Sequence, residues 1–442
     1  MTTPRSTIHP PRGAMAQAAA RCVRGVLCGV LAGAAAAGAA LAQDAALGTD
    51  VQGLLAYARA QSPDLGAMRH EAEAAAQRIG PAGALPDPVL RVELMNITNY
   101  GSDAPPSLLP SRVGETKYTF MQPLPSWGKR DLRRDVAAAD ARQADARTEA
   151  TWIELSARIK SAYAEYYRAA GNERLAGEVL GLMSRLEQVA QARYAGGLVG
   201  QTDAIRAQLE QTAMRTELIS MQSEKRQLRA RLNGLLARDG AAPLAEPQGL
   251  RPLPAMDTAD AVALAERARA RNPQIQTELA RLLSAQKNRE LVQRNRYPDV
   301  LVGVAPSQMG NRITTWELMF EVNIPLQQES RRSQESEADA MAAAAGARAE
   351  AIAQQLLGDL AGNLAGLDAA RRTETLIKTQ LLPQSELGLQ STLSAYENGK
   401  AEFAMLLDAQ RQIRRARQEL LKSQVEAQLR LADIERILGE DL

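Results

Sequence analysis

Cysteine and histidine are nearly absent from this chain of 442 residues. Both cysteines, Cys22 and Cys28, and one of the two histidines, His9, lie within the first 42 residues, which leaves His70 alone beyond them. Disulfides, His/Cys zinc sites and histidine-based triads are therefore excluded from the rest of the chain. Neither a G-x-G-x-x-G nor a P-loop motif occurs. The sequence predicts a protein that is not an enzyme, with no cofactor or metal site, and with His70 as a surface residue.

Long hydrophobic runs are also missing, except near the N-terminus. Four arginines precede an apolar stretch at 25–41, which ends in Ala-Leu-Ala before Gln43. This pattern predicts a secretory signal at 1–42, with a retained transmembrane helix as the alternative. No later stretch approaches about 18 consecutive apolar residues, so any later crossing of a membrane would be by β-strands.

The charges of the remaining chain nearly cancel. The signal takes four of the 53 lysines and arginines and none of the 51 acidic residues, so the remainder carries a formal charge of −2. A basic face for nucleic acid is therefore not expected. Aromatic residues make up 3% of the chain, and alanine fills many helical core positions. Such small side chains permit close packing of helices but give little bulk for a thick globular core.

One stretch of the chain occurs twice. At an offset of 202, Tyr194 pairs with Tyr396 and Gly197 with Gly399, and long heptad-patterned runs flank both copies. Each glycine is expected to cap a helix where the chain reverses, which predicts two helical hairpins. The predicted domains are a first repeat at 43–240, a proline-rich linker at 241–257 and a second repeat at 258–442.

The long helices have a clear pattern. A proline-free helix is expected over 130–193, about 95 Å long at 1.5 Å per residue. Apolar residues every seventh position from Leu406 to Ile434 predict coiled-coil packing of the second return helix. Pro383 should bend the incoming helix of the second hairpin, and Gly181, at the equivalent position, should bend the first.

Shorter elements precede each hairpin. The segments 51–79 and 259–296 are each predicted to form two short helices, broken at Ser62-Pro63 and at Asn272-Pro273. A pair of strands should follow each of them.

Strict alternation of apolar and polar residues predicts these strands. The clearest covers 316–324, its repeat lies around 118–124, and the partners are 89–96 and 300–305. Roughly ten residues per strand suits a tilted transmembrane β-strand, although a soluble hairpin remains an alternative. The side chains expected to face lipid are Tyr118, Phe120, Trp316, Leu318 and Phe320.

Four strands are too few to close a membrane barrel, for which about eight are needed. Chains must therefore share a barrel, because an open edge in lipid leaves backbone groups without partners. Two chains would supply eight strands and three would supply twelve, and only the larger barrel leaves a useful lumen. A homotrimer is the favoured assembly.

Several motifs together resemble those of the TolC-type outer-membrane factors, which serve tripartite efflux pumps and type I secretion. They are Gly197-Leu198-Val199 with Thr202-Asp203, Tyr396-x-x-Gly399 with Leu407-Asp408-Ala409, Gln122-Pro123-Leu124-Pro125, and Trp127-Gly128-Lys129-Arg130. The resemblance implies a mainly α fold with a small β part: a homotrimer in the outer membrane of a Gram-negative cell, with a 12-stranded transmembrane β-barrel and a periplasmic α-barrel.

The same resemblance implies a passive efflux channel whose partners are a periplasmic adaptor, an inner-membrane resistance-nodulation-division transporter and outer-membrane lipid. Leu85-Pro86-Asp87-Pro88 and the Trp127-Gly128-Lys129-Arg130 stretch look most like the branch that exports heavy metals. Drug efflux and type I secretion are alternatives within the family. A periplasmic coiled-coil adaptor or structural protein is the alternative from another class.

Site residues follow from the same resemblance. Asp408 and Asp203 match a pore gate, although Met405 stands where another member of the family has a second aspartate. Tyr396 and Asp203 match a latch that keeps the helices closed; its arginine is replaced by Ala401, and Lys400 could substitute for it. The alternative for both aspartates is that they are solvated acids at helix ends. The residues expected to dock the adaptor and pump are Gly197, Leu198, Val199, Gly399, Lys400 and Phe403.

Overall fold

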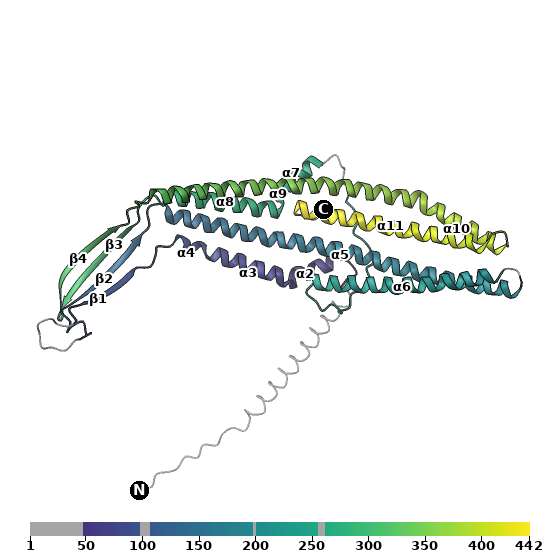
Figure 1. Cartoon of the computed structure of the whole chain (residues 1–442), viewed down its shortest axis with the longest axis horizontal. Helices are drawn as coiled ribbons and strands as arrows, with labels where there is room; N and C mark the ends of the chain where they lie inside the picture. The colour runs from purple at the N-terminus through teal and green to yellow at the C-terminus, as the bar shows by residue number, and fades with distance from the viewer. Residues whose placement is uncertain (1–46, 98–106, 198–199, 255–260) are drawn as a thin grey trace, which may run out of the picture. The chain divides into compact units, whose positions relative to one another are not determined.

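The computed structural model describes residues 47–97, 107–197, 200–254 and 261–442 (Figure 1). The predicted signal at 1–42, together with Leu198 and Val199, lies outside the described residues. The elements, in chain order, are α2 (Val51–Gln61), α3 (Pro63–Gln77), α4 (Ile79–Gly83), β1 (Val89–Met95), β2 (Glu115–Leu124), α5 (Lys129–Ala195), α6 (Gln201–Leu235), α7 (Ala261–Arg271), α8 (Pro273–Arg294), β3 (Val300–Met309), β4 (Arg312–Val322), α9 (Gln328–Leu376), the π-helical turn η2 (Ile377–Leu381), α10 (Leu382–Glu397) and α11 (Phe403–Leu438).

The same order of elements thus occurs twice, as short helices, two strands, a long helix and a return helix. The described chain nevertheless forms two compact units that each draw on both halves. One contains 47–60, 159–252 and 375–428, and the other contains 61–158, 253–374 and 429–442. Each unit therefore contains contacts between the first and the second repeat of the sequence.

The two breaks in the short helices are confirmed. Ser62 Oγ accepts a hydrogen bond from Leu65 N at 3.3 Å and caps α3. Asn272 Oδ1 accepts from Gln274 N at 2.8 Å and from Ile275 N at 3.0 Å, and caps α8. In both helices proline follows the cap, where its missing N–H leaves no hydrogen bond unmade.

The four predicted strands form one antiparallel sheet in the order β1-β2-β3-β4 (Figure 1). The register places Phe120 opposite Leu90 on one side and Val304 on the other, and Val304 opposite Leu318. One face of the sheet therefore carries a row of apolar side chains across all four strands. Pairing of β2 with β3 joins the two halves of the chain.

The two faces of this sheet differ in burial. On the apolar face Leu318 is 77% exposed and Phe320 is 70% exposed. On the opposite face Thr119 and Ser307 are buried, and Lys117 Nζ lies 2.6 Å from Glu317 Oε2. A sheet in water normally buries its apolar face and exposes its polar one. Here the apolar face is the one left open.

The stretch at 126–130 fixes the junction between the sheet and the helices. Lys129 is buried, and its Nζ donates to Asp299 Oδ1 at 2.8 Å and to the Tyr297 carbonyl at 2.9 Å. The same carboxylate oxygen accepts from Ser126 N at 2.8 Å. The start of α5 is thereby bound to the start of β3.

The long helices follow the predictions closely. α5 has 67 residues, which is about 100 Å of helix. Before Pro383 the helix widens into η2, where Leu382 N donates to Ile377 O, five residues back. At Gly181 α5 continues without a break, and the bend expected there stays a prediction. Glycine keeps its N–H and so can continue the helical hydrogen bonds, whereas proline cannot. No helix in the described ranges has the length and apolarity needed to span a membrane.

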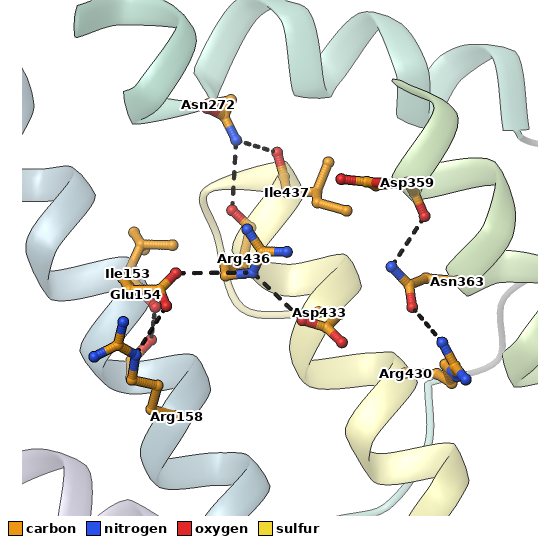
Figure 2. A network of polar contacts seen from close by, with 11 residues as sticks. Ile153, Glu154, Arg158, Asn272, Asp359, Asn363, Arg430, Asp433, Arg436 and Ile437 are labelled. Carbon is orange, nitrogen blue, oxygen red and sulfur yellow. Dashed lines mark hydrogen bonds and ion pairs between the residues drawn. The ribbon is translucent and has the colours of Figure 1, made fainter. Parts of the chain in front are cut away.

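A polar network surrounds the C-terminal end of α11 (Figure 2). Asn272 Nδ2 donates to the Ile437 carbonyl at 2.8 Å, so this one buried amide caps α8 and also binds the end of α11. Arg436 Nε lies 3.4 Å from Asp433 and 3.9 Å from Glu154 of α5. Arg430 Nη1 donates to Asn363 Oδ1 of α9 at 3.1 Å (Figure 2). The end of α11 is therefore fixed to three other segments of its unit.

The two caps provide a matched pair of variants. Ser62→Ala removes a single cap and should reduce stability by about 1 kcal/mol. Asn272→Ala also leaves a buried carbonyl of α11 without its donor, so we expect a loss of about 2–3 kcal/mol. Thermal unfolding followed by circular dichroism in detergent measures both. Equal losses for the two variants would contradict the double role of Asn272.

Candidate functional site at the helix turns

The chain reverses at two turns, one between α5 and α6 and one between α10 and α11. Gly197 has φ +71° and Gly399 has φ +73°, in the left-handed region that glycine adopts without strain. Gly399 N donates to Tyr396 O at 3.0 Å, and Lys400 N donates to Ala395 O at 2.8 Å. These two bonds form a Schellman cap. The prediction that both glycines cap helices is confirmed.

Arg193, in the last turn of α5, contacts the end of α10. Its Nη1 donates to the backbone carbonyl of Tyr396, and its guanidinium carbon lies 5.0 Å from the centre of the Tyr396 ring. A cation over an aromatic face stabilises by about 0.5–2 kcal/mol, with the larger values at desolvated sites. The Tyr396 ring is 1% exposed. One arginine thus connects the two hairpins at their turns.

Asp203, near the start of α6, also affects the pKa of Tyr396. Burial raises the pKa of Tyr396, the charge of Arg193 lowers it, and the charge of Asp203 raises it again. The net direction is upward. The buried Tyr396 hydroxyl has no hydrogen-bond partner in the part of the chain that the structure describes. Tyr396 is therefore held by packing of its ring and by its backbone, not by its hydroxyl.

Lys400 does not take the place of the missing arginine. Its residue is exposed, and its side chain makes no hydrogen bond or ion pair with any described residue. Arg193 occupies the position beside Tyr396 instead. The family motif in the second hairpin does not indicate Arg193, because this residue belongs to the first hairpin.

The structure also corrects the prediction that Phe403 docks the adaptor and pump. It is fully buried, and its ring centre lies 5.6 Å from that of Tyr396. Docking by this side chain is therefore wrong, because a partner could not reach it; Phe403 instead packs the interior of the turn. The buried residues of this core are Leu175, Ala176, Val179, Met183, Leu186, Ala190, Ala207, Met214, Tyr396, Phe403, Leu406 and Leu407. Gly197, Gly399 and Lys400 remain exposed, as docking requires.

Asp408 lies on an exposed strip of α11. Its side chain is 71% exposed, and Arg411 Nη1 is 3.8 Å from it. Met405, one turn earlier, is exposed on the same side of the helix. Asp203 is half-buried, and no hydrogen bond or ion pair joins it to Asp408 within the described ranges. Within the described part of one chain, Asp203 and Asp408 therefore do not interact directly.

Three arginines along α11 bind it to its neighbours. Arg411 Nη2 lies 2.7 Å from Glu210 of α6, and this hydrogen bond raises the pKa of Arg411. Arg414 pairs with Glu217 of α6, and Arg417 Nη1 lies 3.4 Å from Glu178 of α5. The spacing of three residues is the sequence signal that could have revealed this row of ion pairs. Among the described residues, no group of three or more His, Cys, Asp or Glu side chains could hold a metal ion.

These turns belong to a chain with two helical hairpins and a four-stranded sheet whose apolar face is exposed. Residues 54–238 and 264–440 match the family described as outer membrane efflux protein, and the chain belongs to this TolC-type family. It is 25% identical, over 324 residues, to the cobalt-zinc-cadmium resistance protein CzcC of Cupriavidus metallidurans, covering 72% of this chain and 75% of that protein.

Solved structures share the fold. The outer membrane protein VceC of Vibrio cholerae aligns with a TM-score of 0.75 at 20% identity, covering 88% of this chain and 96% of that one. CusC aligns with a TM-score of 0.74 at 17% identity, covering 88% of this chain and 92% of that one. The predicted family and the mainly α fold with a small sheet are thereby confirmed.

The ion pairs of α11 allow a controlled test. Arg411→Gln leaves Glu210, whose side chain is 14% exposed, without its charged partner, and we expect a loss of about 1 kcal/mol that shrinks at high salt. Arg415→Gln removes an equal charge from an exposed position of the same helix that makes no ion pair with the described residues. Thermal unfolding at low and high salt compares them. Equal effects would mean that the pair between Arg411 and Glu210 does not stabilise the hairpins.

Proposed function

We propose that this chain is the outer membrane channel of a tripartite efflux pump, a passive homotrimeric conduit from the periplasm to the exterior. The observation that carries this proposal is the exposed apolar face of the sheet. Phe320, Leu318 and Trp316 follow one another along β4 at every second position, and all three are exposed. In water such a face would promote aggregation, whereas lipid would cover it favourably.

The remaining predicted lipid-facing residues lie on the same face. Phe120 is exposed, and Tyr118 is half-buried, with its hydroxyl donating to Gln308 Oε1 at 3.0 Å. Trp127, which sequence reasoning did not select, is 94% exposed just after β2. Tryptophan at the end of a membrane strand suits the interface between lipid and water.

The edges of the sheet favour a shared barrel. Within the described residues β1 and β4 each pair along one side only. Each backbone group left without a partner in lipid costs several kcal/mol, so an isolated sheet of this kind would not remain in a membrane. Pairing β1 of one copy with β4 of the next repeats the same contact and closes a ring. Three copies supply twelve strands, enough to enclose a lumen.

The helical hairpins would form the periplasmic part, and the exposed turn residues would meet the adaptor and a resistance-nodulation-division transporter in the inner membrane. Heavy-metal cations are the proposed cargo, because a related protein is described as a cobalt-zinc-cadmium resistance protein. Drug efflux and type I secretion are the alternatives within the family. Weak binding along the conduit suits passage of ions better than tight sites do.

Assembly is tested first by native mass spectrometry of the full chain extracted from outer membranes in detergent. A species of three chains is expected, because a closed ring of copies pairs all the strand edges and three copies, unlike two, also enclose a lumen. A monomer that stays soluble without detergent would contradict the proposal and would favour a periplasmic adaptor or structural protein.

The membrane assignment is tested by Phe320→Arg. A charged side chain facing lipid near the middle of the bilayer should cost about 2–4 kcal/mol and reduce the amount of assembled channel. The control is Glu321→Arg, because the next residue of β4 points to the opposite face and tolerates charge. Quantification of heat-resistant trimers in outer-membrane fractions gives the comparison. A harmless Phe320→Arg would favour a soluble hairpin.

The gate assignment is tested by Asp408→Asn. Three copies of this exposed carboxylate around a narrow opening would attract cations and repel anions. The variant should therefore reduce cation selectivity and block by multivalent cations in planar-bilayer recordings. Glu397→Gln removes the same charge from an exposed position of α10 and serves as the control. If selectivity changes in neither variant, Asp408 is a solvated acid at a helix end.

A further inference from the structure

We infer that a cavity between α5 and α6 is a binding site for a small organic carboxylate, with Arg229 as the residue that binds its carboxyl group. The return helix α6 runs beside the second part of α5 (Figure 1), and the cavity between them has a volume of about 340 Å³. The residues that line it are Tyr166, Glu173, Gln222, Lys225, Arg226 and Arg229. All of them belong to one compact unit of the chain.

The spacing of these residues brings them to one place. The four that α6 contributes stand at positions i, i+3, i+4 and i+7 of the helix, and therefore share one of its faces. Tyr166 and Glu173 are seven residues apart on α5 and share a face for the same reason. Three cations of α6 thus line a single cavity.

The charge of Lys225 is already compensated. Its Nζ lies 2.8 Å from Glu173 Oε2, and it also pairs with Glu246 of the linker between the two repeats. Burial lowers the pKa of Lys225, the hydrogen bonds with the two glutamates raise it, and the net direction is upward. Lys225 therefore stays charged at neutral pH and is bound to protein carboxylates.

The two arginines of the cavity are not compensated in this way. Arg229 Nε is buried and has no hydrogen-bond partner in the part of the chain that the structure describes. Arg226 Nε donates to the backbone carbonyl of Gln222 at 3.3 Å, and neither arginine forms an ion pair with a described residue. A buried donor without a partner costs about 1–3 kcal/mol, and more when its group is charged. A bound anion would supply the missing acceptor.

Neighbouring glutamates of the two helices do not supply it, because they bind other arginines. Glu165 Oε2 lies 2.9 Å from Arg231 Nη1, and Glu224 Oε1 lies 3.0 Å from Arg168 Nη2. The nearby carboxylates of α5 and α6 thus have partners outside the cavity, and the arginine at its wall is left for a ligand.

The charge and size of the cavity indicate which anion fits. Three cations and the two glutamates bound to Lys225 give a formal charge of +1, which complements a monoanion. The edge of a guanidinium that contains Nε binds the two oxygens of a carboxylate with parallel hydrogen bonds. The volume is far above the roughly 30 Å³ share of one water molecule and within the range of small-molecule sites. A carboxylate with an organic body therefore fits better than a small inorganic dianion.

Tyr166 suits the organic part of such a ligand. Its side chain is buried and presents an aromatic ring to the cavity. Burial raises the pKa of Tyr166, the charges of Lys225 and Arg229 lower it, and the net direction is upward. The hydroxyl is therefore protonated at neutral pH and can donate to a carboxylate.

The test is isothermal titration calorimetry of the full chain in detergent with benzoate, which combines a carboxylate and an apolar ring. Benzamide has nearly the same shape without the charge, and inorganic phosphate is the dianion for comparison. We expect one benzoate per chain, no detectable binding of benzamide, and weaker binding of phosphate than of benzoate. The affinity for benzoate should fall as the salt concentration rises.

Variants assign the binding to this cavity. Arg229→Gln should weaken benzoate binding at least tenfold, because it removes a charge-assisted pair of hydrogen bonds. Arg229→Lys should fall between this variant and the parent protein, since lysine keeps the charge but not the planar fork. Arg206→Gln is the control, because Arg206 is an exposed arginine of α6 that does not line the cavity. Arg226→Gln changes an exposed residue, and should weaken binding more than the control even if Arg229→Gln fails to fold.

The site is overturned if benzoate does not bind the parent protein, or if Arg206→Gln weakens binding as much as the cavity variants do. Tighter binding of phosphate than of benzoate would overturn the assignment of a carboxylate. These measurements involve no transport, so the site can stand or fail whether or not the chain conducts ions as the proposed function requires.

Discussion

Backbone groups at the ends of helices and strands need hydrogen-bond partners, and much of this structure depends on how they are supplied. Inside a long helix every backbone N–H and C=O has a hydrogen-bond partner, so few unpaired groups remain along the 67 residues of α5. The backbone groups that need other partners lie at the helix ends, where the chain reverses. Gly399 satisfies carbonyls of α10 through a Schellman cap, and Asn272 satisfies the start of α8 and the end of α11 with one side chain. Removing either kind of cap would leave polar groups without partners.

The sheet has the same requirement but meets it differently. The two inner strands, β2 and β3, are each paired on both sides by strands of the same chain. Within the described residues, the outer strands β1 and β4 are each paired on one side only. A helix can complete its own hydrogen bonds, whereas a sheet with open edges needs another strand. Within the described residues, the sheet is therefore the part of the protein whose outer strands each have one side without a paired strand.

Much of this architecture could be predicted from the sequence, because it is encoded in local periodicity. The heptad positions Leu406, Ile413 and Ile434 are buried, and 316–322 lies in β4 as the alternation predicted. Ser62 and Asn272 were recognisable as caps because the signal lies within four residues. The second bond of Asn272, to the end of α11, joins residues 165 apart and has no local signal.

The site was harder to predict for the same reason. Phe403 looked available for docking because it follows an exposed glycine turn, yet it is the first residue of α11 and turns into the core. Arg193 could not be selected, because its importance comes from a carbonyl 203 residues away. The duplication suggests that matching residues such as Tyr194 and Tyr396 have equal surroundings. In the structure Tyr194 is exposed and Tyr396 is buried.

The polar network at the end of α11 has a consequence for the order of folding. Arg436 contacts Glu154, and Ile437 accepts from Asn272, so these contacts join residues that leave the ribosome far apart in time. The compact unit that contains the sheet includes 429–442 as well as 61–158. Contacts of such long sequence separation slow folding, because a large loop must close before they form. The strands are therefore synthesised long before the helix end that completes their unit, and their apolar side chains need protection from aggregation during that interval.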